Sequence, residues 1–185
     1  MNTSELAPGF NQSQERLGEV DLGEAYLSFQ LDEQNQAVFS MEQVKEVIVV
    51  PANQITPMPN MPEYVLGLLA RRSRVMWVVD LAQMVTSQPL TSNVRQYKVI
   101  IIQVNQASLQ QNILLGASQT QALFGVIVQE VKGGIRLTPN LIQSPPENLP
   151  LNLIPCLRGC VLQPDNMLLV LDAEALVRSP ILPSN

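Results

Sequence analysis

The sequence predicts a mainly β fold, and two features of its composition carry that prediction. Hydrophobic residues make up 46% of the 185 residues but aromatic residues only 4%, so Val, Leu and Ile supply most of the apolar side chains. Branched side chains of this kind favour pleated strands. With 14 Pro and 9 Gly to interrupt them, these residues indicate many short strands joined by turns. The length fits one sizeable domain, or two small ones that share a core.

Charge is distributed unevenly along the chain. Residues 1–33 contain seven acidic residues and one basic residue, a net charge of −6, so the total of −5 leaves +1 for residues 34–185. We expect a flexible acidic tail at 1–23, a folded domain at 24–180 and a short tail at 181–185. A nearly neutral domain argues against nucleic-acid binding, which usually needs a basic face.

The N-terminal residues lack the features of a targeting segment. They have no positive region followed by an apolar stretch, and Asn2 stands where a myristoylated protein has glycine. The charge-free stretch 99–129 is repeatedly interrupted by Gln and Asn, whose amides would each cost roughly several kcal/mol in lipid. We therefore expect a soluble, cytoplasmic protein without membrane insertion.

The first strands are predicted by alternation. Apolar and polar residues alternate over 25–31, which indicates a strand with one buried face. The polar segment 32–36 is expected to turn the chain, and a second strand to begin at Ala37.

A short helix is expected next. Ser40 offers an oxygen to the free N–H groups of a helix start, and Gln43 stands at the capping-box position, which predicts a helix over 41–47. A strand at 48–50 then leads into proline-rich extended chain. The segment 62–67 starts with Pro and ends with Gly, which is typical of a single helical turn.

Three arginines stand in a predicted hairpin connection. The apolar runs 67–70 and 75–79 predict paired strands, and the second run is continuous enough to indicate burial on both faces. Arg71, Arg72 and Arg74 lie between them. Because neighbouring like charges repel, this turn is disfavoured unless an acidic group meets it. A solvated turn and a contact surface both stay open as interpretations.

The middle of the chain alternates between strands and polar segments. Asp80 followed by Gln83 predicts a second helix start. A linker at 86–96 marks the approximate split between two halves, and 97–104 predicts a strong strand. The Gln-, Asn- and Ser-rich segment 105–122 is expected to be a long loop with a weak strand.

The C-terminal part repeats an earlier pattern. After a strand at 123–129 and proline-rich chain, residues 156–177 match 68–85 in form, with an Arg near a turn, a second strand, and Asp172 where Asp80 stood. One hairpin-plus-helix unit used twice predicts two similar half-domains.

The residue types exclude most catalytic chemistry. The chain has no His, so the usual base for a nucleophile and the usual zinc ligand are missing. Cys156 and Cys160 would lie about 13 Å apart on one strand, beyond disulfide reach, and are interpreted as small buried hydrophobic residues. Asp80 and Asp172 are interpreted as helix caps, with an acid and base pair in an enzyme as the alternative. No catalytic residue, metal or cofactor is expected.

Seven segments, in this order, are similar to the CheW-like domain of bacterial chemotaxis adaptors over residues 25–178. They are YLSFQL, VKEVI, MPEYVLGLL, the Arg-bearing turn, VMWVVDL, FGVIVQEV and LRGCVLQPDNMLLVLDAEALV. The resemblance implies a CheW-like fold of two small five-stranded β-barrels with a few short helices. It also implies a non-catalytic adaptor that couples the cytoplasmic tip of a methyl-accepting receptor to the CheW-like domain of a CheA-like histidine kinase. The alternative is a stand-alone inhibitor or competitor that occupies the kinase without a receptor.

The resemblance also implies which residues contact the receptor. Val44 and Glu46 match the family's Val-x-Glu, and Arg72 matches the arginine of its Asn-Leu-Arg-Gly turn. Gly125 and Val131 match its Gly-x-x-Val-Asp-x-Val segment. The resemblance identifies no kinase-contact residues.

The chain departs from the family at several of these positions. Gln129 stands at the expected Asp, Ser73 at a Gly and Trp77 at a Pro, while Arg71 and Arg74 add charge that we include in the receptor surface. We interpret the chain as a divergent member, for which a phototaxis or pilus-motility pathway is a natural setting.

Overall fold

The computed structural model describes residues 23–87, 89–90, 94–105, 121–147, 149–164 and 166–178. Its strands are β1 (Glu24–Gln30), β2 (Gln36–Ser40), β3 (Val44–Pro51), β4 (Ile55–Thr56), β5 (Val65–Arg71), β6 (Arg74–Asp80), β7 (Gln96–Asn105), β8 (Gln121–Val128), β9 (Glu130–Leu137), β10 (Leu157–Leu162) and β11 (Met167–Leu171). The two α-helices are α1 (Leu81–Thr86) and α2 (Ala173–Arg178), and short 3₁₀ turns lie at Ala52–Gln54, Pro139–Leu141 and Ile154–Cys156. The expected tails at 1–23 and 181–185 and the segment 105–122 fall almost wholly outside the described residues.

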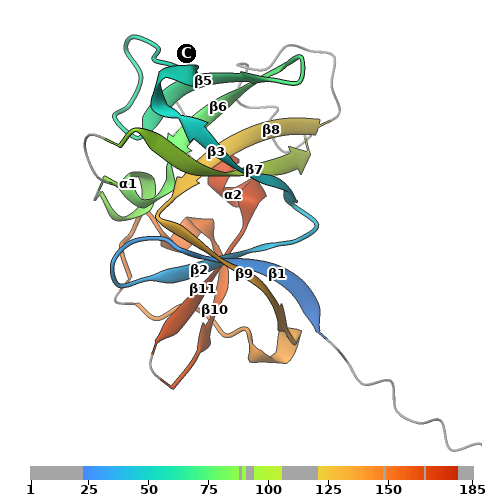
Figure 1. Ribbon diagram of the computed structural model, residues 1–185. Coiled ribbons are helices and arrows are strands. Elements are labelled where there is room, and N and C mark those ends of the chain that lie inside the picture. Colours follow the sequence, from blue (N-terminus) through green and yellow to red (C-terminus); the bar gives the residue numbers. More distant parts are fainter. Residues whose placement is uncertain are drawn as a thin grey trace, which may run out of the picture.

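The strands form two curled sheets stacked on each other (Figure 1), which confirms the mainly β fold. One sheet has the order β10-β11-β2-β1-β9 and the other β3-β7-β8-β6-β5-β4, the sixth strand being only two residues long. The sheets agree with the two small barrels that the family resemblance implies. The split expected near 86–96 does not separate them, because β7 and β8 follow that segment yet complete the sheet that β3 begins.

Three apolar clusters hold the two sheets in place. The curl of the five-stranded sheet encloses Tyr26, Val38, Leu137, Val161, Leu168 and Val170. The curl of the six-stranded sheet encloses Val50, Ile55, Leu69, Met76, Val78, Val99, Ile101 and Ile127. The largest cluster draws on both sheets and both helices, and includes the stacked rings of Phe29 and Phe39, whose centroids are 5.2 Å apart. The expected burial of Trp77 is confirmed, because its exposed fraction is 9%.

Alternation along β7 links two of these clusters. Val99 and Ile101 point into the curl of the six-stranded sheet, whereas Ile100 and Ile102 belong to the large cluster. Successive side chains of a strand point to opposite faces, so a strand between two cores must be apolar at every position. The continuous apolar runs of β6, β7 and β8 follow from this position in the middle of the sheet.

The predicted repeat is confirmed in detail. The β5–β6 hairpin followed by α1 corresponds to the β10–β11 hairpin followed by α2, and each hairpin has a register shift one residue after its start, at Leu66 and Arg158. The N–H of Asp80 donates to the carbonyl of Tyr64 at 2.7 Å, and the N–H of Asp172 donates to that of Cys156 at 2.9 Å. The second strand of each hairpin then pairs in parallel with a strand from elsewhere, β6 with β8 and β11 with β2.

Two predicted helical segments are wrong. Residues 41–43 form a turn in which the N–H of Gln43 donates to the carbonyl of Ser40 at 3.0 Å, and β3 begins at Val44. In segment 62–67, residues 62–65 form a turn in which the N–H of Val65 donates to the carbonyl of Pro62 at 2.9 Å, and β5 begins at Val65. In both places pairing with a neighbouring strand overrides a local helix signal, because it joins the segment to a buried sheet.

The two hairpins each place a glycine where another segment crosses closely, and this generates a stability prediction. A Cβ at Gly159 would lie 2.5 Å from Cγ2 of Ile142 and 2.6 Å from the carbonyl oxygen of Gln143. We expect Gly159→Ala to lower the free energy of unfolding by about 1–3 kcal/mol, measured by urea denaturation. The matched control is Gly134→Ala, because a Cβ there comes no closer than 4.0 Å to its nearest neighbour. Equal stability of the two variants would contradict this packing.

Candidate functional site

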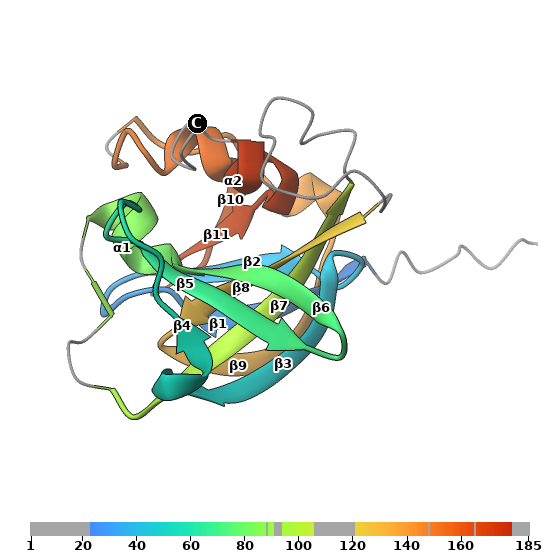
Figure 2. The ribbon, with the colours of Figure 1, turned by 90° about the horizontal axis from the view of Figure 1, so that it is seen from above.

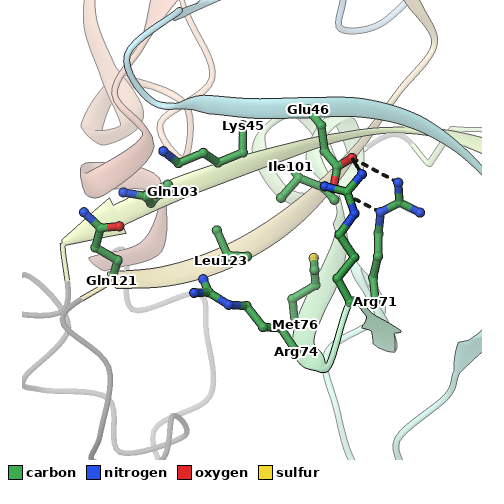
Figure 3. A pocket seen from close by; sticks show the side chains of 10 residues that line it. Lys45, Glu46, Arg71, Arg74, Met76, Ile101, Gln103, Gln121 and Leu123 are labelled. Carbon is green, nitrogen blue, oxygen red and sulfur yellow. Dashed lines mark hydrogen bonds and ion pairs between the residues drawn. The ribbon is translucent and has the colours of Figure 1, made fainter.

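A pocket of about 310 Å³ opens at one rim of the curled six-stranded sheet (Figure 3). Five of the six strands, all except the two-residue β4, each bring to it a polar side chain two positions away from an apolar residue on the same face. These pairs are Glu46 with Ile48, Arg71 with Leu69, Arg74 with Met76, Gln103 with Ile101, and Gln121 with Leu123. Because residues two apart share a face, the inward-facing side chains of these five strands change from apolar to polar at this rim.

A β-bulge at the start of β3 decides where three side chains lie. Val44 pairs with Ile102 and Glu46 with Ile101, which leaves Lys45 as the extra residue. A bulge re-aims the side chains around it. Val44 consequently packs against the large cluster between the sheets, while Lys45 and Glu46 both line the pocket.

The arginine turn is tighter than predicted. Arg71, the last residue of β5, pairs with Arg74, the first residue of β6, so the connection contains only Arg72 and Ser73. Both have positive φ, 48° and 62°, as the type I′ turn of a two-residue hairpin requires. Side chains other than Gly or Asn are strained in this conformation, which makes this an unusual turn for its sequence.

Glu46 is the acidic group that meets this turn. The Nε of Arg71 donates to Oε1 of Glu46 and its Nη2 donates to Oε2, both at 3.0 Å, while Nη2 of Arg72 lies 3.6 Å from the same Oε2. The hydrogen bonds from Arg71, helped by the charges of both arginines and opposed by burial, hold the pKa of Glu46 below its usual value. The two-bond geometry fixes the Arg71 guanidinium as well as its charge.

The pocket keeps a positive charge after this pairing. Lys45, Arg71, Arg72 and Arg74 face one carboxylate, that of Glu46. Within the part of the chain that the structure describes, neither Lys45 nor Arg74 has a carboxylate at ion-pair distance. The exposed fraction of the side chain is 76% for Arg72 but 35% for Arg71.

The structure brings together four of the seven residues predicted to bind the receptor, namely Glu46, Arg71, Arg72 and Arg74. Val44 and Val131 are partly buried against the cluster between the sheets, and neither lines the pocket. Gly125 is buried inside the six-stranded sheet, where an added Cβ would lie 2.9 Å from Val99 and 3.2 Å from Val78. It therefore offers no surface for direct contact.

Both aspartates are occupied as helix caps. Oδ1 of Asp80 accepts from the N–H of Gln83 at 2.9 Å and its Oδ2 from the N–H of Leu90 at 2.8 Å. Burial raises the pKa of Asp80, against the effect of these backbone donors. Asp172 accepts from Glu174 and Ala175 at 2.8 and 3.1 Å. Neither residue lines the pocket, so nothing pairs them for acid and base chemistry there.

Three further expectations concern the two cysteines, metal binding and membrane insertion. Cys156 and Cys160 are buried and unbonded to each other, but Cys156 lies on a 3₁₀ turn and not on the predicted strand. In the described segments, His, Cys, Asp and Glu side chains form no group of three that could hold a metal ion. No described helix has the length and apolar character needed to cross a membrane.

Sequence reasoning missed part of the pocket. Lys45 falls within the helix predicted at 41–47, and Gln103 and Gln121 fall within the charge-free stretch 99–129, so the sequence predicts no site at these three lining residues. The sequence does contain a signal for the two glutamines. Side chains two residues apart lie on the same face of a strand, so Gln103 shares the inward face with Ile101, and Gln121 shares it with Leu123.

Comparisons with known proteins agree with the fold. The model of the CheW-like domain family matches residues 25–180. Among solved structures, the scaffolding protein TtCheW from Thermoanaerobacter tengcongensis is similar with a TM-score of 0.63 and 21% identity, covering 87% of this chain and 99% of that one. No curated protein matches the chain.

The ion pair of Glu46 makes stability depend on pH. Its folded-state pKa lies below the usual 4.5, so the contribution is present above pH 4.5 and is lost as pH falls through the folded-state pKa. We expect Glu46→Gln to be less stable than the wild type at pH 7, with the difference shrinking at pH values below 4.5, as measured by urea denaturation.

The control is Glu42→Gln, which removes an exposed carboxylate that has no ion pair among the described residues. If both variants lost the same stability at pH 7, the pair with Arg71 would contribute nothing specific.

Proposed function

The chain belongs to the family of CheW-like domains, and we propose that it is a non-catalytic adaptor that couples a methyl-accepting receptor to a CheA-like histidine kinase. The observation that carries the receptor half of this proposal is the rim pocket. Positions that correspond to receptor contacts in the family, Glu46 on β3 and Arg72 in the turn between β5 and β6, meet there although they are far apart in the sequence.

Arg72 is the residue that we propose as the principal receptor contact. Arg71 holds Glu46 through two hydrogen bonds, so Arg72 shares that carboxylate only at 3.6 Å and keeps most of its side chain exposed. An exposed guanidinium beside two further cations attracts an acidic surface and sets its orientation. Arg71 and Arg74 would extend the same contact.

The apolar part of the proposed receptor surface lies at the junction of the two sheets. Val44 from β3 and Val131 from β9 are both partly buried there and contact the same cluster. Burial of such side chains against a receptor helix would supply affinity, at about 25 cal/mol per Å² of apolar surface. Gly125 would act indirectly, by allowing β8 to pack closely on Val78 and Val99.

The proposal is tested by mixing the protein at about 10 μM with its cognate kinase and a receptor cytoplasmic fragment, and measuring co-sedimentation. We expect a ternary complex, and receptor-dependent kinase activity when the adaptor is present. Binding of neither partner would refute the adaptor. Binding of the kinase alone, with activity reduced and unaffected by receptor, would identify an inhibitor or competitor instead.

The role of Arg72 is tested separately. We expect Arg72→Glu to weaken binding of the receptor fragment at least about tenfold, because it reverses a charge at the contact, and to leave kinase binding and thermal unfolding unchanged. The control Arg95→Glu makes the same charge change at an exposed arginine that does not line the pocket. Equal loss of receptor and kinase binding in Arg72→Glu would contradict a receptor-specific role.

A further inference from the structure

The rim pocket gathers positive charge out of proportion to the protein. Four of the 11 Lys and Arg residues line it, Lys45, Arg71, Arg72 and Arg74, in a chain whose net charge is −5. Glu46 neutralises one of them, which leaves the pocket at +3. A concave site with one sign of charge concentrates ligands of the opposite sign.

One side of the pocket carries four side chains that can each donate a hydrogen bond, Lys45, Arg74, Gln103 and Gln121. Figure 3 shows Lys45 and Arg74 reaching in from opposite sides of Leu123, with Gln103 and Gln121 near the same end, away from the pair of Glu46 and Arg71. Among the described residues, the side chains of Lys45, Arg74, Gln103 and Gln121 form no hydrogen bond or ion pair with another protein group.

The number and directions of these donors indicate the chemistry of the ligand. An ammonium from β3, a guanidinium from β6 and two amides from β7 and β8 approach a common space from four strands. A planar carboxylate is satisfied by one arginine, as Glu46 is by Arg71, whereas a tetrahedral phosphate accepts from several directions at once. Arg and Lys together are also the usual binders of phosphate.

The apolar base and the volume of the pocket limit the size of the ligand. Met76, Ile101 and Leu123 form an apolar base beneath the polar rim. A volume of about 310 Å³ stands at the small end of the range of ligand sites, about 300–1,000 Å³. The space therefore suits a phosphate that carries a few carbon atoms, and is too small for a dinucleotide.

From these observations we infer that the rim pocket binds a small organic phosphate, held by Lys45, Arg74, Gln103 and Gln121. This inference goes beyond the adaptor function and does not require it. Since the proposed receptor contact Arg72 lines the same pocket, phosphate and receptor would compete, and each would lower the affinity of the other by the same factor.

The test is isothermal titration of the full chain, without receptor or kinase, using glycerol 3-phosphate, inorganic phosphate and the dicarboxylate glutarate as probes. We expect glycerol 3-phosphate to bind with a Kd of about 1 mM or tighter, inorganic phosphate more weakly, and glutarate at least about tenfold more weakly. The double substitution Lys45→Gln and Arg74→Gln should weaken glycerol 3-phosphate binding at least about tenfold without changing thermal unfolding.

The control is Arg95→Gln, which removes one positive charge at an exposed position outside the pocket and should leave glycerol 3-phosphate binding as in the wild type. Three results would overturn the inference: no binding of either phosphate at about 10 mM, equal weakening by Arg95→Gln, or glutarate binding as tightly as glycerol 3-phosphate. The last result would assign the pocket to carboxylates, such as the acidic side chains of a partner. None of these outcomes bears on kinase binding, so the adaptor proposal is tested independently.

Discussion

The middle strands of the six-stranded sheet are buried on both faces, and this constraint decides where the protein can carry charge. β6, β7 and β8 separate the core inside the curl from the cluster between the sheets, so a polar side chain along them would lose its hydration. Polar residues are tolerated only where these strands end. Arg74, Gln103 and Gln121 stand at one rim, while Asp80 at the other end has its carboxylate bonded to two backbone N–H groups.

At the rim, the pair of Glu46 and Arg71 joins strands that the sheet keeps apart. β7, β8 and β6 lie between β3 and β5 in the strand order, and the curl brings β3 and β5 together again (Figure 2). The same carboxylate offsets the repulsion in a turn where Arg71 and Arg74 are direct partners. A hairpin with positive φ at both Arg72 and Ser73 is thus retained where glycine would be less strained, which is consistent with a turn kept for its side chains.

The elements that depend on a local pattern of residues could be predicted from the sequence. Those that depend on pairing between distant segments of the chain could not. The repeat centred on Asp80 and Asp172 was visible because hairpin, cap and helix are contiguous. Ser40 and Gln43 mimic a capping box and therefore predict a helix over 41–47, whereas the structure is decided by the long-range pairing of β3 with β7. Likewise, Lys45 enters the pocket only through a bulge, and the burial of Gly125 depends on how tightly β8 packs within the curl.

The central claim is that the rim pocket, with the arginine turn, is the surface that a receptor contacts. Amide chemical shifts of the isotope-labelled protein, recorded while a receptor cytoplasmic fragment is added, test it most directly. The account predicts the largest changes at Lys45, Glu46 and the turn from Arg71 to Arg74. Changes confined to the β10–β11 hairpin, with the rim unaffected, would contradict it.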